Sequence, residues 1–143
     1  MIRHQVIAAL RKVTANFLIG MTPGVPYDFD LEEEPTEQDL ISSGSFRISY
    51  HQNNKEVGFI DVYRSGRGWY VFESHVDTNL RRSGIASKLY DHADFLVGKV
   101  RPQLLDPEIN DADISEEALK FWEKRDSGTY KELIEKLDEE GYL

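Results

Sequence analysis

Cysteine is absent from this chain of 143 residues. Without thiols the chain forms no disulfide, no thiolate metal site and no cysteine nucleophile. The absence also suits a reducing compartment, and we expect a cytoplasmic protein. No apolar run approaches the roughly 20 residues of a membrane span, and the beginning of the chain lacks the cleavage site of a signal peptide. We therefore expect no membrane association.

Basic residues are scarce as well. The chain has 17 Lys and Arg against 26 Asp and Glu, which gives a net charge of −9 at pH 7. Contacts to phosphate backbones need a basic surface, so we expect no nucleic-acid partner, and the charge favours small or cationic partners. His4, His51 and His92 are too scattered for metal ligands, and we expect no metal. Hydrophobic residues make up 40% of the chain, enough for the core of a single domain over 1–143.

Acidic residues gather in a proline-containing loop from Met21 to Ser45. No Lys or Arg offsets them between Lys12 and Arg47. Two interpretations stay open: a solvated loop, or an acidic wall that attracts a cationic amine substrate. The acidic residues of this loop include Asp28, Asp30, Glu32, Glu33, Glu34, Glu37 and Asp39.

Hydrophobic periodicity predicts helices at both ends of the chain and strands in the middle. Three antiparallel strands are expected between Phe46 and Val76, joined by turns at Asn53 to Glu56 and Ser65 to Gly68. The other expected elements are an amphipathic helix over Ile2 to Phe17, a helical turn over Glu37 to Ile41, a helix from Ile85 to Val100, a short parallel strand at Leu104-Leu105, a helix over Ser115 to Arg125, and a C-terminal helix with Thr129 and Glu132 as its capping box.

The most informative stretch follows the third strand, where an apolar strand end at Val76 leads into Arg81-Arg82-Ser83-Gly84-Ile85-Ala86 and an amphipathic helix. Small residues let the backbone approach a ligand closely, and the first N–H groups of a helix have no intrahelical partner. The helix dipole favours negative charge at this end. This pattern predicts a cradle for a pyrophosphate.

The spacing Arg81-x-x-Gly84-x-Ala86 between a strand and a helix resembles the signature of the GNAT superfamily of acyl-CoA-dependent N-acyltransferases. The resemblance implies an α/β fold with a mixed, mainly antiparallel sheet flanked by helices. Here an amphipathic N-terminal helix and an extra C-terminal helix depart from the usual pattern. It also implies acetyl-CoA as acyl donor. The residues implied to bind it are Val76, through its backbone, Arg81, Arg82, Ser83, Gly84, Ile85, Ala86, Ser87 and Ser115.

The later stretch from Ser115 to Arg125 is similar to a late helix of that family, with Ser115 at an Asn position and Ala118 matching. Trp122 stands where many relatives place a tyrosine that protonates the departing CoA thiolate. An indole N–H donates a hydrogen bond but is no usable acid near neutral pH, so the proton donor stays open. The alternative is that Phe121 and Trp122 are aromatic core residues.

Glu73 and His75 are the candidate general bases for the attack of an amine on the thioester. Both lie in the strand that leads to the cradle, and strand alternation places them on one face unless a bulge intervenes. The alternative is a solvated strand face. A Ser–His–Asp hydrolase is unsupported, because the chain has no nucleophile elbow.

Three hypotheses follow from the sequence. The leading one is an N-acetyltransferase that transfers the acetyl group of acetyl-CoA to a small-molecule or peptide amine by direct attack. The second is a non-catalytic domain of the same fold that binds CoA or a protein partner. The third is an unrelated α/β interaction protein. The acceptor, the acyl length and the assembly state, monomer or homodimer, stay open.

Overall fold

The computed structural model describes residues 16–29 and 32–142. Its strands are β1 (Phe17–Gly20), β2 (Ser45–Gln52), β3 (Lys55–Ser65), β4 (Gly68–Val76) and β5 (Val100–Pro102). Its helices are α2 (Glu37–Ser43), α3 (Ile85–Val97), α4 (Glu116–Arg125) and α5 (Ser127–Glu139), with 3-10 turns η2 (Thr78–Leu80) and η3 (Gln103–Leu105). The helix expected over Ile2 to Phe17 falls, up to residue 15, outside the described residues.

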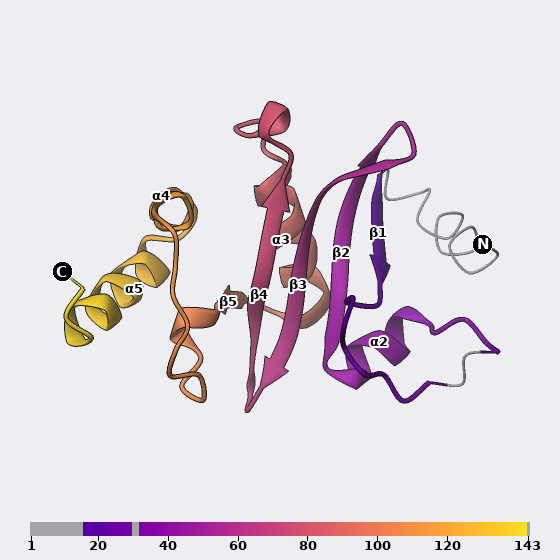
Figure 1. Ribbon diagram of the computed structural model, residues 1–143, viewed down its shortest axis with the longest axis horizontal. Coiled ribbons are helices and arrows are strands. Elements are labelled where there is room, and N and C mark those ends of the chain that lie inside the picture. Colours follow the sequence, from indigo (N-terminus) through magenta and orange to yellow (C-terminus); the bar gives the residue numbers. More distant parts are fainter. Residues whose placement is uncertain (1–15, 30–31, 143) are drawn as a thin grey trace.

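The strands form one sheet in the order β1-β2-β3-β4-β5. All neighbours are antiparallel except β4 and β5, which are parallel and joined through α3. Figure 1 shows α3 lying across one face of the sheet, with α4 and α5 beyond the β5 edge. The sheet is therefore mixed, mainly antiparallel and flanked by helices, with an additional C-terminal helix, as the sequence predicts.

The central meander follows from local sequence. Asn53 and Asn54 both adopt positive φ, 52° and 62°, the conformation of a tight hairpin turn that Asn tolerates better than most residues. The flanking strands alternate: Ile60 and Val62 of β3 are buried in the core beneath α3, whereas Asp61 between them faces the other side of the sheet. Alternation with period two thus produces one apolar face and one polar face.

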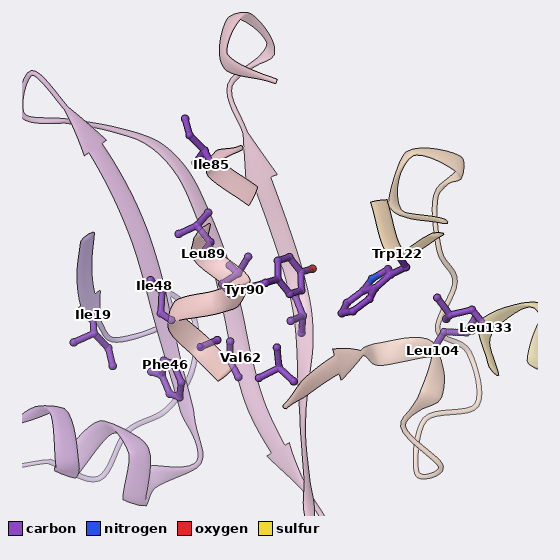
Figure 2. Packing of buried hydrophobic residues seen from close by; sticks show 14 of the residues in the cluster. Ile19, Phe46, Ile48, Val62, Ile85, Leu89, Tyr90, Leu104, Trp122 and Leu133 are labelled. Carbon is purple, nitrogen blue, oxygen red and sulfur yellow. The ribbon is translucent and has the colours of Figure 1, made fainter. Parts of the chain in front are cut away.

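One hydrophobic core joins the sheet to the helices. Leu89 of α3 is completely buried, and full burial of one such side chain contributes roughly 1.5–3 kcal/mol relative to exposure. Figure 2 shows these side chains between α3 and the sheet, continuing through Tyr90 and Trp122 toward the C-terminal helices. The labelled members are Ile19, Phe46, Ile48, Val62, Ile85, Leu89, Tyr90, Leu104, Trp122 and Leu133.

Several expectations for the edges of the fold were wrong. Phe17 begins a strand instead of ending a helix, because residues 17–20 pair with β2. The parallel strand is Val100–Pro102, not Leu104-Leu105, because Gly98 ends α3 and Val100 pairs with Trp69. Leu104 lies in the turn η3.

The cap of the last helix also differs from the expectation. Asp126, and not Thr129, is the N-cap of α5: its carboxylate accepts hydrogen bonds from the N–H groups of Gly128 and Thr129. Lys99 Nζ contacts the same carboxylate at 2.6 Å. Thr129 is buried inside the first turn instead. The helix therefore begins earlier than predicted, on an ion pair with the segment before β5.

Candidate functional site

The parallel pair β4–β5 is short and opens into a fork. The strands pair at three positions, the last being Val71 with Pro102. Proline has no N–H to continue the ladder, and the chain turns away into η3 directly after it. On β4 the register with β3 shifts between Asp61 and Val62, which leaves Phe72 as the extra residue of a bulge. We call the point after Val71 and Pro102 the fork.

Beyond the fork, one backbone edge of β4 has no β5 residues beside it. The N–H of Asp77 donates to Val57 of β3 at 2.8 Å, so alternation turns the backbone groups of Val76 and Ser74 to the opposite edge. The Val76 carbonyl there accepts a hydrogen bond from Arg81 Nε at 3.2 Å. The carbonyl expected to bind pantetheine thus has a side-chain donor in this structure.

The start of α3 has the geometry of an anion cradle. Gly84 is its N-cap with φ +87°, and a Cβ built at this position would meet no atom within 4 Å. The first hydrogen bond of the helix runs from the Lys88 N–H to the Gly84 carbonyl. The preceding N–H groups, those of Ile85, Ala86 and Ser87, have no helical acceptor before them. Open space in front of free donors is what a phosphate needs.

Two arginines precede this glycine and differ in their environments. Arg81 bridges the end of β4 to α4, since its Nη1 lies 3.3 Å from Glu117. Arg82 adopts a left-handed backbone, φ +69°, which is uncommon outside glycine and asparagine. The hydroxyl of Ser83 donates to the Leu80 carbonyl, and this bond closes the turn.

Ser115 caps the start of α4. Its hydroxyl accepts a hydrogen bond from the Ala118 N–H at 3.1 Å, so it is the N-cap of that helix. The ion pair of Arg81 with Glu117 brings the same end of α4 to the cradle. A role of Ser115 in CoA binding remains a prediction.

Aromatic rings fill the space between α3 and α4. Trp122 is 2% exposed and packs edge-on against Tyr90, with ring centroids 5.2 Å apart. Phe121 packs on Tyr90 from the same helix at 4.9 Å. Figure 2 shows Tyr90 and Trp122 pointing toward one another beside β4. The interpretation of Trp122 as an aromatic core residue is confirmed.

Tyr90 places a hydroxyl near the unpaired edge of β4. Burial raises the pKa of Tyr90 to about 12, although its hydrogen bond with Ser74 acts in the opposite direction. The side chain therefore stays protonated at neutral pH and is a hydrogen-bond donor. No sequence pattern indicates this residue, because only the packing of α3 on the sheet brings Tyr90 to Ser74.

The two candidate bases lie together on the polar face of the sheet. The bulge at Phe72 precedes them, so alternation holds from Glu73 onward, and they pair with Asp61 and Phe59 of β3. His75 Nε2 lies 3.0 Å from Asp77 Oδ1, a contact that orients the imidazole. The i, i+2 spacing of His75 and Asp77 along an extended chain is a sequence signal for this contact.

A buried ion pair lies beside the candidate bases. Asp61 is 2% exposed and accepts two hydrogen bonds from Arg47, at 2.7 and 2.9 Å. The Arg47 guanidinium also lies 3.6 Å from the centre of the Phe59 ring. The hydrogen bond to Asp61, with the charges of Glu56 and Glu73, raises the pKa of Arg47, although burial opposes it. Arg47 is thus the fixed positive charge among three carboxylates.

A second buried carboxylate anchors the chain after β5. Tyr63 donates to Asp106 Oδ2 at 2.7 Å, and Ser65 donates to Oδ1 at 3.0 Å. Burial alone would raise the pKa of Asp106, but the hydrogen bonds from Tyr63, the Glu108 backbone and Ser65 hold it below its usual value. The network ties the segment after η3 to β3, and so fixes the position of the chain that leaves β5 at the fork.

The acidic loop contributes structure as well as charge. Asp39 completes a reciprocal capping box with Thr36 at the start of α2. The Tyr27 hydroxyl donates to the Ser45 carbonyl at 2.8 Å and holds the loop against β2. Residues 30 and 31 lie outside the described residues, and attraction of a cationic substrate by this loop remains a prediction.

Within residues 16–29 and 32–142, no group of three His, Cys, Asp or Glu side chains is placed to hold a metal ion. None of the helices in that part of the chain has the length and apolar character needed to cross a membrane.

No family model and no curated protein sequence matches the chain. Similar proteins are found among solved structures. An IAA acetyltransferase from Bacillus cereus ATCC 14579 is 17% identical, with 76% of this chain and 75% of that chain covered and a TM-score of 0.46. The aminoglycoside acetyltransferase meta-AAC0020 from an uncultured soil metagenomic sample is 18% identical, with 87% and 78% covered and a TM-score of 0.46. AAC(6')-Iy, in complex with a bisubstrate analogue of CoA, is 16% identical, with 76% and 75% covered and a TM-score of 0.44. These similarities concern the fold and do not show the activity of this chain.

Proposed function

We propose that this chain is an acetyl-CoA-dependent N-acetyltransferase. The observation that carries the proposal is the placement of the Arg81-x-x-Gly84-x-Ala86 turn at the start of α3, beside the strand edge that the fork leaves open. The open space at Gly84 and the N–H groups of Ile85, Ala86 and Ser87 fit a pyrophosphate. Residues 72–76 of β4 present a backbone edge to an extended pantetheine arm.

The chemistry requires a neutral amine, because only its lone pair attacks the thioester carbonyl. A nitrogen–carbon bond forms, the carbon–sulfur bond breaks, and the sulfur leaves as a thiolate that takes up a proton. The proton lost by nitrogen passes to Glu73 or His75, directly or through a water. Both side chains lie on the polar face near the fork, and Asp77 orients His75. Holding the two reactants together lowers the barrier by up to roughly 7–11 kcal/mol in good cases.

A non-catalytic domain that binds CoA or a protein partner is the second candidate. Two observations favour it: Trp122, which stands where the resemblance implies a tyrosine acid, is buried, and Arg81 bonds the Val76 carbonyl. Binding without turnover would identify this alternative.

A thermal-shift measurement with acetyl-CoA, followed by a thiol-release assay on a panel of amines, tests the proposal. A ligand that binds only the folded state at a hundredfold excess over Kd stabilises it by about 2.7 kcal/mol. A shift together with thiol release supports the acetyltransferase, and a shift without release supports the binding domain. No shift at saturating acetyl-CoA would contradict both the acetyltransferase and a CoA-binding domain, and would leave only the domain that binds a protein partner.

A further inference from the structure

A hollow of about 240 Å³ opens on the polar face of the sheet, opposite α3. Its lining is Thr22, Val25, Ser45, Asp61, Val62, Tyr63, Phe72 and Gln103, and we call it the Phe72 hollow. Phe72 and Gln103 are the residues directly after the last β4–β5 pair, so the hollow adjoins the fork. A molecule within it would lie next to the point where the two strands part.

The walls of the Phe72 hollow are mainly apolar. Phe72 is 59% exposed, although it is a large apolar side chain, and its ring forms one wall. Val25 and the ring of Tyr63 line it as well. The carboxylate of Asp61 is already paired with Arg47, so it leaves no uncompensated charge in the wall. The hollow therefore suits an uncharged, apolar group.

One lining residue has a buried oxygen without a hydrogen-bond partner among the described residues. Thr22 is 8% exposed, and its Oγ1 has no hydrogen-bond partner among the described residues. Buried hydroxyls are nearly always hydrogen-bonded in folded proteins. This oxygen is closed to solvent, and the hydroxyl of the lining residue Tyr63 already donates to Asp106, so the hollow offers few free polar groups to a polyhydroxylated molecule.

Negative charge lies at the side of the hollow nearest the fork. Glu73 pairs in register with Asp61, and such cross-strand neighbours have Cβ atoms roughly 4.5–5.5 Å apart. Its exposed carboxylate can therefore reach a group that extends from the hollow. An ammonium would pair with Glu73 and, after losing its proton, would attack from that position.

We infer that the Phe72 hollow is the acceptor subsite and takes a small primary amine with an apolar body. The inference rests on the proposed function in naming the bound amine an acceptor. The hollow is smaller than the roughly 300–1,000 Å³ of pockets for drug-sized ligands. A compact arylalkyl or alkyl amine fits this volume, whereas an aminoglycoside would leave its hydroxyl groups without partners.

Phenethylamine is the probe, with spermidine and kanamycin as polar comparisons. Binding is measured by calorimetry without acetyl-CoA, and turnover is measured by thiol release with it. The variants are Phe72→Ala, which removes one wall, and Val25→Trp, which fills the space. Phe95→Ala is the matched control, because Phe95 is 85% exposed on α3 and lies outside the lining. Circular dichroism checks that each variant is folded.

We expect phenethylamine to bind the wild type and the Phe95→Ala variant equally, and the Phe72→Ala and Val25→Trp variants about tenfold or more weakly. Turnover of phenethylamine in preference to kanamycin and spermidine would support the acceptor role. Phenethylamine binding without any effect of acetyl-CoA would refute the proposed function but retain the hollow as an amine site. Turnover of kanamycin alone, or phenethylamine binding that both variants leave unchanged, would overturn this inference while leaving the acetyltransferase intact.

Discussion

Arg81 and Val76 are joined by a hydrogen bond of 3.2 Å from the guanidinium Nε to the backbone carbonyl. The bond is made on the edge of β4 that the fork leaves open. If the chain binds CoA as proposed, Arg81 has two opposing effects: its charge attracts the phosphates, while its side chain occupies the backbone carbonyl that the pantetheine arm would use.

Replacing Arg81 and Arg82 together by Ala should weaken acetyl-CoA binding, because the cradle loses two positive charges. The ion pair of Arg81 with Glu117 is exposed, so fold stability should change by less than about 1 kcal/mol. Calorimetry gives the affinity and urea unfolding gives the stability. Arg67→Ala, at an exposed arginine in the β3–β4 turn, is the control. Equal affinity in the double variant and the wild type would show that neither arginine contributes to acetyl-CoA binding.

Gly84→Glu should abolish the acetyl-CoA thermal shift. The new side chain extends into the open space before α3 and repels phosphate, and its left-handed backbone costs about 1–2 kcal/mol. Gly66→Glu is the matched control, because Gly66 also has a positive φ and open space around it but lies in a hairpin turn. Both variants should lose similar stability, and only Gly84→Glu should lose the rise in melting temperature that acetyl-CoA causes. A full shift in a folded Gly84→Glu protein would place the cradle elsewhere.

Glu73→Gln or His75→Gln should lower kcat/KM by about 10²–10⁴-fold if that residue accepts the amine proton, with acetyl-CoA affinity unchanged. The loss should shrink as pH rises, because more of the substrate amine is then already neutral. Asp77→Asn should reduce the rate only if His75 is the base, since Asp77 contacts that ring. Wild-type rates for both strand variants at every pH would show that neither residue accepts the proton. Catalysis would then come from holding the two substrates in position.

Trp122→Phe should cost mainly stability. Trp122 is buried against Tyr90 and Phe121, and a smaller ring leaves a cavity whose penalty grows by about 24 cal/mol for each Å³. Urea unfolding should show a loss of about 1–3 kcal/mol, with kcat retained at temperatures where the variant is folded. A large fall in kcat at unchanged stability would instead give the indole a part in the reaction.

Acid should weaken the attachment of α5. Contacts with Lys99 and the Thr129 N–H lower the pKa of Asp126 to about 2, below that of an unfolded aspartate at about 3.9. Its stabilisation is therefore complete above about pH 4 and is lost as pH falls toward 2. Asp126→Asn keeps an N-cap acceptor without the charge, whereas Asp126→Ala should cost about 0.5–2 kcal/mol more. Identical acid unfolding curves for wild type and Asp126→Asn would contradict this.

The sequence by itself determined the centre of the molecule. The asparagine pair at 53 and 54 dictates a tight turn, strand alternation separates Ile60 from Asp61, and Gly84 permits the left-handed residue from which α3 begins. Each of these features depends on a residue and its near neighbours, so periodicity and turn chemistry suffice to predict it. The turn from Arg81 to Ala86 that opens α3 could be predicted for the same reason, whereas its role as a phosphate cradle stays a prediction.

Only the tertiary structure decided how distant residues meet. Residues 17–20 form a strand because β2 offers them a backbone edge, and Lys99 pairs with the Asp126 carboxylate that caps α5. Tyr90 reaches Ser74 and Trp122 only through the packing of α3 between the sheet and α4. The Phe72 hollow likewise forms between segments that are far apart in the chain. Such contacts depend on the burial of the whole core, and a local sequence pattern does not predict them.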